Sequence, residues 1–232
     1  MLKRVIVAID GPAGAGKSTI ARRVAAKLGY VYIDTGAMYR AVALWALRTG
    51  VDLADMHRLG QLAQAARIQL PAPGRITLNG DDVSDAIREP AVSGAASKVA
   101  AIPAVRRAMV ERQREVADEY SVVMEGRDIG TVVFPEAHVK IYLDASVDVR
   151  AGRRAGDLRD RGLAPDPTEL MREIEDRDRR DRSRANSPLL QAPDATYLDS
   201  STLSAEQVED EILKLVRART SNGQAVRTAD SN

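Results

Sequence analysis

Eight residues near the N-terminus have the types and the spacing of a phosphate-binding loop. They match the pattern G-x-x-x-x-G-K-[ST] at every fixed position, and with the threonine that follows they are Gly11, Pro12, Ala13, Gly14, Ala15, Gly16, Lys17, Ser18 and Thr19. Glycines allow the backbone to wrap closely, so that successive N–H groups point at phosphate oxygens. Lys17 would reach the β- and γ-phosphates of a nucleoside triphosphate, and the Ser18 hydroxyl can bind Mg²⁺. The residues therefore predict a nucleotide site with Ser18 as its metal ligand.

The segments on either side of this loop are those that such a site requires. Residues 5–9 form a short apolar run, which is typical of a strand buried on both faces of a parallel sheet. After the loop, Ile20, Val24 and Leu28 recur every four residues and predict an amphipathic helix. Residues 31–33 would form a second strand. This order of strand, loop, helix and strand predicts an α/β fold in which a helix N-terminus faces the phosphates.

The parallel pattern is interrupted between residues 37 and 118. Within this stretch we expect a helix over 37–48, a hairpin that turns at Asn79-Gly80, and two helices separated by Pro103. The pattern then resumes with strands over 122–124, 139–143 and 196–198 and helices over 147–161 and 167–185. A capping box of Ser204 and Gln207 would open a last helix. Residues 37–118 are therefore interpreted as an inserted module.

The composition excludes several kinds of chemistry. The chain has 232 residues, no Cys and two His, which excludes disulfides, thiolate zinc sites, cysteine nucleophiles and a multi-His metal site. The net charge of +1 does not indicate attraction to nucleic acid or to a membrane surface. No apolar run approaches the roughly 20 residues of a membrane helix, and no secretory signal is visible. We therefore expect a cytoplasmic protein, acting as a monomer, with no nucleic-acid or membrane partner.

Residues outside the loop favour phosphoryl transfer to an acceptor that is itself phosphorylated. The chain lacks the Asn-Lys-x-Asp of a GTPase and the Leu-Ser-Gly-Gly of a transport ATPase. Arg127 closely follows the strand that ends near Glu125, and an Arg beside a phosphate site suggests a second anion. The second pKa of an acceptor phosphate is about 6, so its attacking oxygen is already anionic and needs no His base.

Charge repulsion is then the main obstacle to the reaction. ATP and a nucleoside monophosphate together bring a charge of roughly −6, so that about four protein cations are needed besides one Mg²⁺. Residues 150–184 contain 11 Arg and no Lys, and Arg binds phosphate in a bidentate manner without losing its charge. Most of these arginines are interpreted as members of surface ion pairs, but Arg177, Asp181 and Arg184 share one helical face. The link 162–165 would belong to a mobile lid that excludes water.

Five blocks of the sequence resemble the bacterial cytidylate kinase family. They are residues 9–18 (IDGPAGAGKS), 34–40 (DTGAMYR), 95–100 (AASKVA), 125–135 (EGRDIGTVVFP) and 177–182 (RDRRDR). The first block identifies only a superfamily, whereas the second and the fourth are specific to this family. The resemblance covers about residues 4–218 and implies transfer of the γ-phosphoryl group of ATP to CMP or dCMP, with Mg²⁺, giving ADP and CDP or dCDP.

The resemblance also implies a three-part kinase. A core with a five-stranded parallel sheet flanked by helices carries the phosphate loop, an insertion binds the monophosphate, and a short lid closes over the donor. The boundaries that we expect are residues 1–36 and 119–219 for the core, about 155–166 for the lid within it, 37–118 for the insertion and 220–232 for a disordered tail.

Carried over by position, the resemblance assigns roles to single residues. Lys17, Arg127 and Arg184 would serve catalysis, and Arg153 and Arg159 would join the phosphate loop in binding ATP. Its implied CMP-binding residues are Thr35, Arg40, Ser97, Arg106, Arg127, Asp128, Arg177, Asp181 and Arg184. Among them Arg40, Arg127 and Arg184 would hold the acceptor phosphate, and Arg177 and Asp181 would face the sugar. Ser97, Arg106 and Asp128 would recognise cytosine, since a carboxylate accepts from its N4 amino group and Arg and Ser can donate to O2 and N3.

Several alternatives stay open in the sequence. The arginines that reach the ATP phosphates could be Arg159 and Arg161 or the preceding Arg153 and Arg154. Asp34 could hold a water of Mg²⁺ or bond its own turn, and Thr35 could contact the acceptor or serve the turn. The acceptor could be UMP, dTMP or a non-nucleotide acid. The chain could also be a nucleotide-gated regulatory protein without transfer activity.

Overall fold

The computed structural model describes residues 4–160 and 162–220. These residues divide into two compact units, one formed by residues 4–32 and 120–220 and the other by residues 33–119. Within the described ranges, no helix is both long enough and apolar enough to cross a bilayer. The predicted tail from residue 221 onward and the lid residue Arg161 lie outside the described residues.

The first unit is built on a five-stranded sheet. Its strands are β1 (Ile6–Asp10), β2 (Val31–Asp34, whose last two residues are assigned to the second unit), β6 (Val122–Gly126), β7 (Val139–Asp144) and β8 (Thr196–Asp199), in the order β2-β6-β1-β7-β8. β1 pairs in parallel with both β6 and β7, and β7 pairs in parallel with β8. The predicted α/β class and the five-stranded core are confirmed. Because the strands are parallel, their carboxyl ends meet at one edge, where ligands of such sheets bind.

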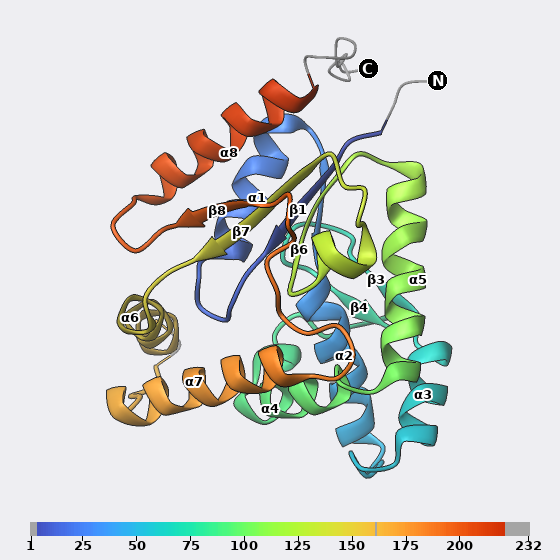
Figure 1. Ribbon diagram of the computed structural model, residues 1–232. Coiled ribbons are helices and arrows are strands. Elements are labelled where there is room, and N and C mark those ends of the chain that lie inside the picture. The colour runs from blue at the N-terminus through green and yellow to red at the C-terminus, as the bar shows by residue number, and fades with distance from the viewer. Residues whose placement is uncertain (1–3, 161, 221–232) are drawn as a thin grey trace. The chain divides into compact units, whose positions relative to one another are not determined.

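Two helices cover one face of this sheet. They are α1 (Lys17–Leu28) and α8 (Ala205–Thr220), which lie side by side in Figure 1. The predicted apolar stripe of α1 is buried against the strands together with Val208 and Ile212 of α8. The capping box is present, since the backbone N–H of Ser204 donates to Gln207 Oε1 at 2.8 Å and that of Gln207 donates to Ser204 Oγ at 3.2 Å. This core fixes the start of α1, and with it the end of the phosphate loop.

A second helical pair of this unit has its own small apolar core. It consists of α6 (Val147–Arg159) and α7 (Pro167–Ser183), packed through Ala151, Ala155, Leu170 and Ile174. Both helices have side-chain caps at their N-termini, from Ser146 and Asp166. The two predicted charged helices are therefore present, and their few apolar residues hold them together.

The second unit is mainly helical. Its helices are α2 (Thr35–Arg48), α3 (Met56–Ala65), α4 (Pro90–Val99) and α5 (Pro103–Glu119), with a short turn of 3₁₀ helix over Ala86–Arg88. A three-stranded antiparallel sheet joins β3 (Ile68–Gln69), β4 (Thr77–Leu78) and β5 (Asp81–Asp82). The predicted hairpin is confirmed, since Asn79 and Gly80 both have positive φ, 55° and 99°, as a two-residue turn between twisted strands requires.

Candidate active site

The phosphate loop, residues 11–18, joins β1 to α1 in a conformation that requires glycine. φ is 148° at Gly11 and 79° at Gly14, and a Cβ on Gly11 would lie 1.9 Å from the carbonyl oxygen of Leu143. Gly16 is the N-cap of α1, and in the described part of the chain no side chain caps this helix end. The first N–H groups of α1 are therefore left for an anion, which the helix dipole favours.

Lys17 is the first residue of α1, and its side chain is almost completely buried. Nζ donates a hydrogen bond of 2.6 Å to the carbonyl oxygen of Pro12, so the side chain folds back along the loop. Burial, together with the nearby charge of Arg127, lowers the pKa of Lys17 to about 7, and the carboxylates of Glu125 and Asp10 limit this shift. A phosphate bound here would restore the charged form, because it places an anion beside an ammonium that has lost its water.

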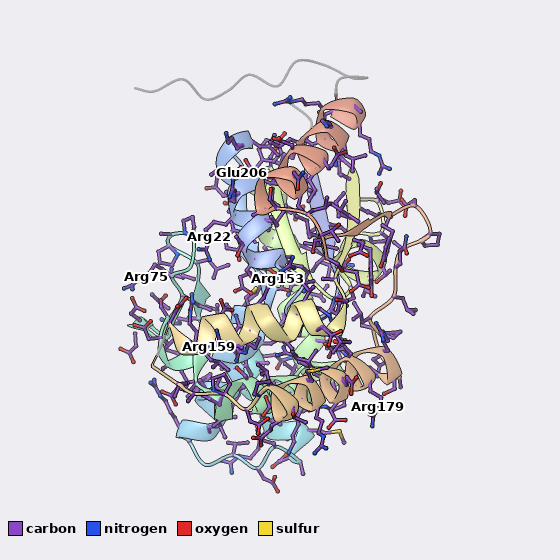
Figure 2. The ribbon with its side chains drawn as sticks, turned by 90° about the vertical axis from the view of Figure 1, so that its left-hand side faces the viewer. Arg22, Arg75, Arg153, Arg159, Arg179 and Glu206 are labelled. Carbon is purple, nitrogen blue, oxygen red and sulfur yellow. The ribbon has the colours of Figure 1, made fainter. Side chains whose placement is uncertain are left out.

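Two arginines of α6 bind the backbone of the phosphate loop. Arg150 Nη1 donates to the carbonyl oxygen of Ala13 at 3.0 Å, and Arg153 Nη1 donates to that of Ala15 at 3.1 Å. Arg153 also donates to Ser200, which follows β8. Figure 2 shows Arg153 on the side of α6 that faces α1, whereas Arg159 lies at the far end of the helix. The ATP contacts assigned to Arg153 and Arg159 stay predictions.

A charged cluster joins the segment after β6 to the end of α7. Arg127 Nε donates to Asp181 Oδ2 at 2.8 Å, and Arg184 Nη2 lies 3.1 Å from Asp181 Oδ1. Burial would raise the pKa of Asp181, but the guanidinium groups of Arg127, Arg184 and Arg177 outweigh it and the pKa is lowered. Four of the predicted CMP-binding residues are thus together, with Asp181 as their ionised centre. The partners of Asp181 here are arginines, and its contact with a sugar hydroxyl stays a prediction.

Asp10 is a buried carboxylate that the sequence analysis did not assign to the site. It ends β1, directly before the phosphate loop, and its two oxygens accept from the backbone N–H groups of Ile129 and Gly130 at 2.8 and 2.7 Å. Burial raises its pKa to about 6, although both hydrogen bonds oppose this. Ile129 and Gly130, the two donors to Asp10, open a π-helical turn, Ile129–Val133, directly after Arg127 and Asp128. Asp10 therefore fixes the two predicted acceptor-binding residues relative to the phosphate loop.

In the second unit, Asp34 and Arg40 form an ion pair at the start of α2. Asp34 Oδ1 accepts from the N–H of Ala37 at 2.8 Å and caps the helix, while Oδ2 accepts from Arg40 Nη2 at 3.0 Å. A Cβ on Gly36 would lie 3.1 Å from both side chains, so this close approach depends on glycine. Of the two roles left open for Asp34, bonding its own turn is present. Thr35 is buried in the first turn of α2, and Arg40 Nε is buried without a hydrogen-bond partner among the described residues.

The three residues predicted to recognise cytosine lie on three different elements. Arg106 is buried on α5, where its guanidinium carbon lies 5.6 Å from the ring centre of Tyr39 and Nη1 donates to the carbonyl oxygen of Ala100. Ser97 is half-buried on α4 of the same unit. Asp128 belongs to the first unit, where it is buried at the N-terminus of the π-helical turn. Their common contact with a base stays a prediction.

The residues that the sequence analysis missed, Asp10 and Arg150, act through backbone groups. A signal for Asp10 existed, because a carboxylate that ends a buried strand directly before a phosphate loop is costly unless it has partners. Arg150 had no comparable signal. It is one of 11 arginines between residues 150 and 184, and only the tertiary structure distinguishes it from its neighbours.

The first unit has the features of a P-loop phosphotransferase. Its parallel sheet carries an uncapped phosphate loop at the carboxyl edge, and the same unit holds a buried lysine and an arginine cluster. Comparison with known proteins narrows this class. A family model described as cytidylate kinase matches residues 7–218. The chain belongs to the cytidylate kinase family.

Individual relatives agree with this assignment. The chain is 62% identical to the cytidylate kinase of Solibacter usitatus (strain Ellin6076) over 95% of this chain and 96% of that protein. It is 52% identical to the cytidylate kinases of Pelotomaculum thermopropionicum, over 94% of this chain and 96% of that one, and of Geobacillus kaustophilus, over 94% and 99%. The predicted family and enzyme class, a nucleoside monophosphate kinase, are confirmed.

Proposed function

We propose that the protein transfers the γ-phosphoryl group of ATP to CMP or dCMP and releases ADP and CDP or dCDP. The observation that supports this most directly is a phosphate loop with a buried lysine in the same compact unit as the cluster of Arg127, Asp181 and Arg184. One part of the unit suits the donor triphosphate, and the other offers guanidinium groups to a second phosphate.

On the donor side, the loop N–H groups and Lys17 bind the β- and γ-phosphates of ATP. Ser18 and Thr19 are exposed at the same helix end, and a hydroxyl oxygen is the hard ligand that Mg²⁺ prefers. In the described ranges, no group of three or more His, Cys, Asp or Glu is placed to hold a metal ion. This fits a Mg²⁺ that binds Ser18 together with phosphate oxygens, and the ion would neutralise charge on the phosphates.

On the acceptor side, Arg127 and Arg184 bind the CMP phosphate together with Arg40, and Arg177 and Asp181 contact the sugar. A phosphate oxygen of CMP forms a bond to the γ-phosphorus as the bond from this phosphorus to the β–γ bridging oxygen breaks. ADP leaves with that electron pair. The attacking oxygen is already anionic, so the step needs no general base, and the protein contributes alignment and positive charge.

Specificity for cytosine would come from Asp128, Arg106 and Ser97. A carboxylate accepts from the N4 amino group, and neither uracil nor thymine has a donor at that position. A buried carboxylate left facing the carbonyl oxygen of uracil would lose its partner, which disfavours UMP. We further propose that the enzyme is cytoplasmic, since both substrates are small soluble nucleotides, and that it acts as a monomer.

A monophosphate panel tests the proposal. ADP release from Mg²⁺–ATP is measured by a coupled assay with CMP, dCMP, UMP, dTMP and AMP in turn. We expect CMP and dCMP to be used at least about 100-fold more efficiently than UMP and dTMP, because an unpaired buried polar group discriminates by about this much or more. Equal use of CMP and UMP contradicts the role of the cytosine-binding residues. Binding of ATP without any monophosphate-dependent ADP release contradicts the transfer reaction itself.

A further inference from the structure

Arg150 bonds to three segments of the first unit at once. Its side chain is 3% exposed. Nε donates to the carbonyl oxygen of Ala145 at 2.9 Å, Nη1 donates to that of Ala13 at 3.0 Å, and Nη2 lies 2.7 Å from Asp178 Oδ2. These groups belong to the turn before α6, the phosphate loop and α7. The planar guanidinium fixes their relative directions as well as their distances.

The bond to Ala13 determines which way the loop presents its N–H groups. The carbonyl of Ala13 and the N–H of Gly14 belong to one planar trans peptide and point in opposite directions. When Arg150 binds the carbonyl oxygen, the N–H of Gly14 is turned to the other side of the loop. A Cβ on Gly14 would lie 3.1 Å from Cβ and from the carbonyl oxygen of Arg150, so α6 packs directly against this peptide.

The bond to Asp178 connects the same guanidinium to the helix of the charged cluster. Asp178 is buried, on the helix that also holds Asp181 and that ends at Arg184. The guanidinium of Arg150 therefore joins the backbone of the phosphate loop to α7 through a buried ion pair, which is costly to break.

We propose that Arg150 is a positioning residue that orients the phosphate loop for ATP and aligns it with α7. All three of its guanidinium nitrogens bond to the protein, which suits a role in positioning the loop and α7 and not a direct contact with the nucleotide. This inference rests on the proposed kinase reaction for its effect on turnover, whereas its effect on ATP binding is independent of that reaction.

Two variants separate the two bonds. Arg150→Lys keeps the charge but cannot bond in three fixed directions, so both the orientation of the loop and its alignment with α7 are lost. Asp178→Asn leaves the bond to Ala13 and removes only the charged link to α7. Arg179→Ala is the matched control, since it removes an exposed ion pair, with Asp176, from the same helix. Figure 2 shows Arg179 on α7.

The affinities for ATP alone and for CMP alone are measured by calorimetry, with kcat from the coupled assay and thermal unfolding as a check on folding. For Arg150→Lys we expect ATP binding to weaken at least about fivefold and kcat to fall at least about tenfold, with CMP affinity within about twofold of the unsubstituted protein. For Asp178→Asn we expect both affinities to stay within about twofold while kcat falls about tenfold, because only alignment is lost. Arg179→Ala should leave all three constants unchanged.

Three results would overturn parts of the proposal. Arg150→Lys with ATP affinity and kcat within about twofold of the unsubstituted protein excludes the positioning role. Loss of thermal stability alone, with normal constants for the folded protein, assigns Arg150 a purely structural role. Normal kcat in Asp178→Asn refutes the link to α7. If the unsubstituted protein releases no ADP with CMP, the proposed function fails, and the ATP affinity of Arg150→Lys still decides whether Arg150 orients the loop.

Discussion

Lys17 is held where its positive charge is costly until a phosphate arrives. Its ammonium group is buried against the loop backbone, and burial together with Arg127 lowers its pKa to about 7. An ATP phosphate beside it removes this penalty, because an opposite charge at contact distance raises the pKa of an ammonium group. Part of the selectivity for an anion is therefore present in the site before the nucleotide binds.

This arrangement predicts proton uptake when ATP binds. At pH 8 Lys17 is mostly neutral in the nucleotide-free protein, and binding should restore its charge, so a substantial fraction of a proton is taken up per ATP. The phosphates of ATP are already ionised at this pH and do not contribute. The uptake by Lys17 should decline as the pH falls below about 7, where Lys17 is already charged in the nucleotide-free protein, and ATP affinity should fall as the pH rises above 7.

Calorimetry in two buffers with different ionisation enthalpies measures the proton count. Lys17→Arg is the matched control, since arginine stays charged and should show no uptake at pH 8. A proton count of zero for the unsubstituted protein at pH 8 would mean that Lys17 is already charged before ATP arrives.

At the scale of the elements, the site depends on links between segments that are distant in the chain. Asp10 joins the end of β1 to the π-helical turn Ile129–Val133 through two backbone N–H groups. The turn follows Arg127 and Asp128 directly, so the carboxylate connects the phosphate loop to two residues that are predicted to bind the acceptor. Burial raises the pKa of Asp10 to about 6, which means that the folded state holds its proton more tightly than the unfolded chain does.

The free energy of unfolding should therefore depend on pH through the difference in the pKa of Asp10 between the folded and unfolded states. Between about pH 4 and pH 6 the folded state binds more protons at Asp10 than the unfolded state, so the contribution of Asp10 to stability is largest at low pH and is lost as the pH rises through 6. The shift corresponds to about 3 kcal/mol. Urea unfolding of the unsubstituted protein and of Asp10→Asn at pH 4.5 and pH 7.5 measures it. The unsubstituted protein should lose about 2 kcal/mol relative to the variant between the two pH values, and parallel pH dependences would contradict the assignment.

Local patterns were enough to predict most elements of the first unit. Three of these patterns each involve only a few neighbouring residues, and each predicted feature is present. They are the apolar run before the loop, the four-residue spacing of the apolar stripe on α1, and the capping box of Ser204 and Gln207. The helix α3 and the strand β3 were not predicted. β3 has only two residues, and its ladder forms with β4 across the intervening loop of residues 70–76. No local pattern specifies such a pairing.

In the candidate site, too, contiguous features could be predicted from the sequence, whereas contacts between distant residues could not. The phosphate loop is contiguous, so its spacing alone predicted it. Arg177 and Asp181 could be interpreted from spacing as a surface ion pair, whereas Asp181 is bonded to Arg127, 54 positions away. Among similar arginines, the sequence does not show that Arg150 bonds to the phosphate loop backbone. Residue types therefore predicted the kind of chemistry, but only the tertiary contacts show which of these residues bond to one another.

At the scale of the whole molecule, a nearly neutral chain places several cations together in its first unit. The net charge is +1, yet Lys17, Arg127 and Arg184 are buried or half-buried at the phosphate loop or in the cluster around Asp181 that is predicted to bind the acceptor. In that cluster Asp181 balances the arginines. A phosphate can share or replace this carboxylate, because guanidinium groups bind both in the same bidentate geometry.

The most direct test of this account is a crystal structure with a non-hydrolysable ATP analogue, Mg²⁺ and CMP bound together. We predict that Arg127 and Arg184 donate hydrogen bonds of about 2.9 Å to the CMP phosphate and that Lys17 leaves the carbonyl of Pro12 to contact the analogue's phosphates. Arginines that keep Asp181 as their only partner, with both nucleotides out of reach, would contradict it.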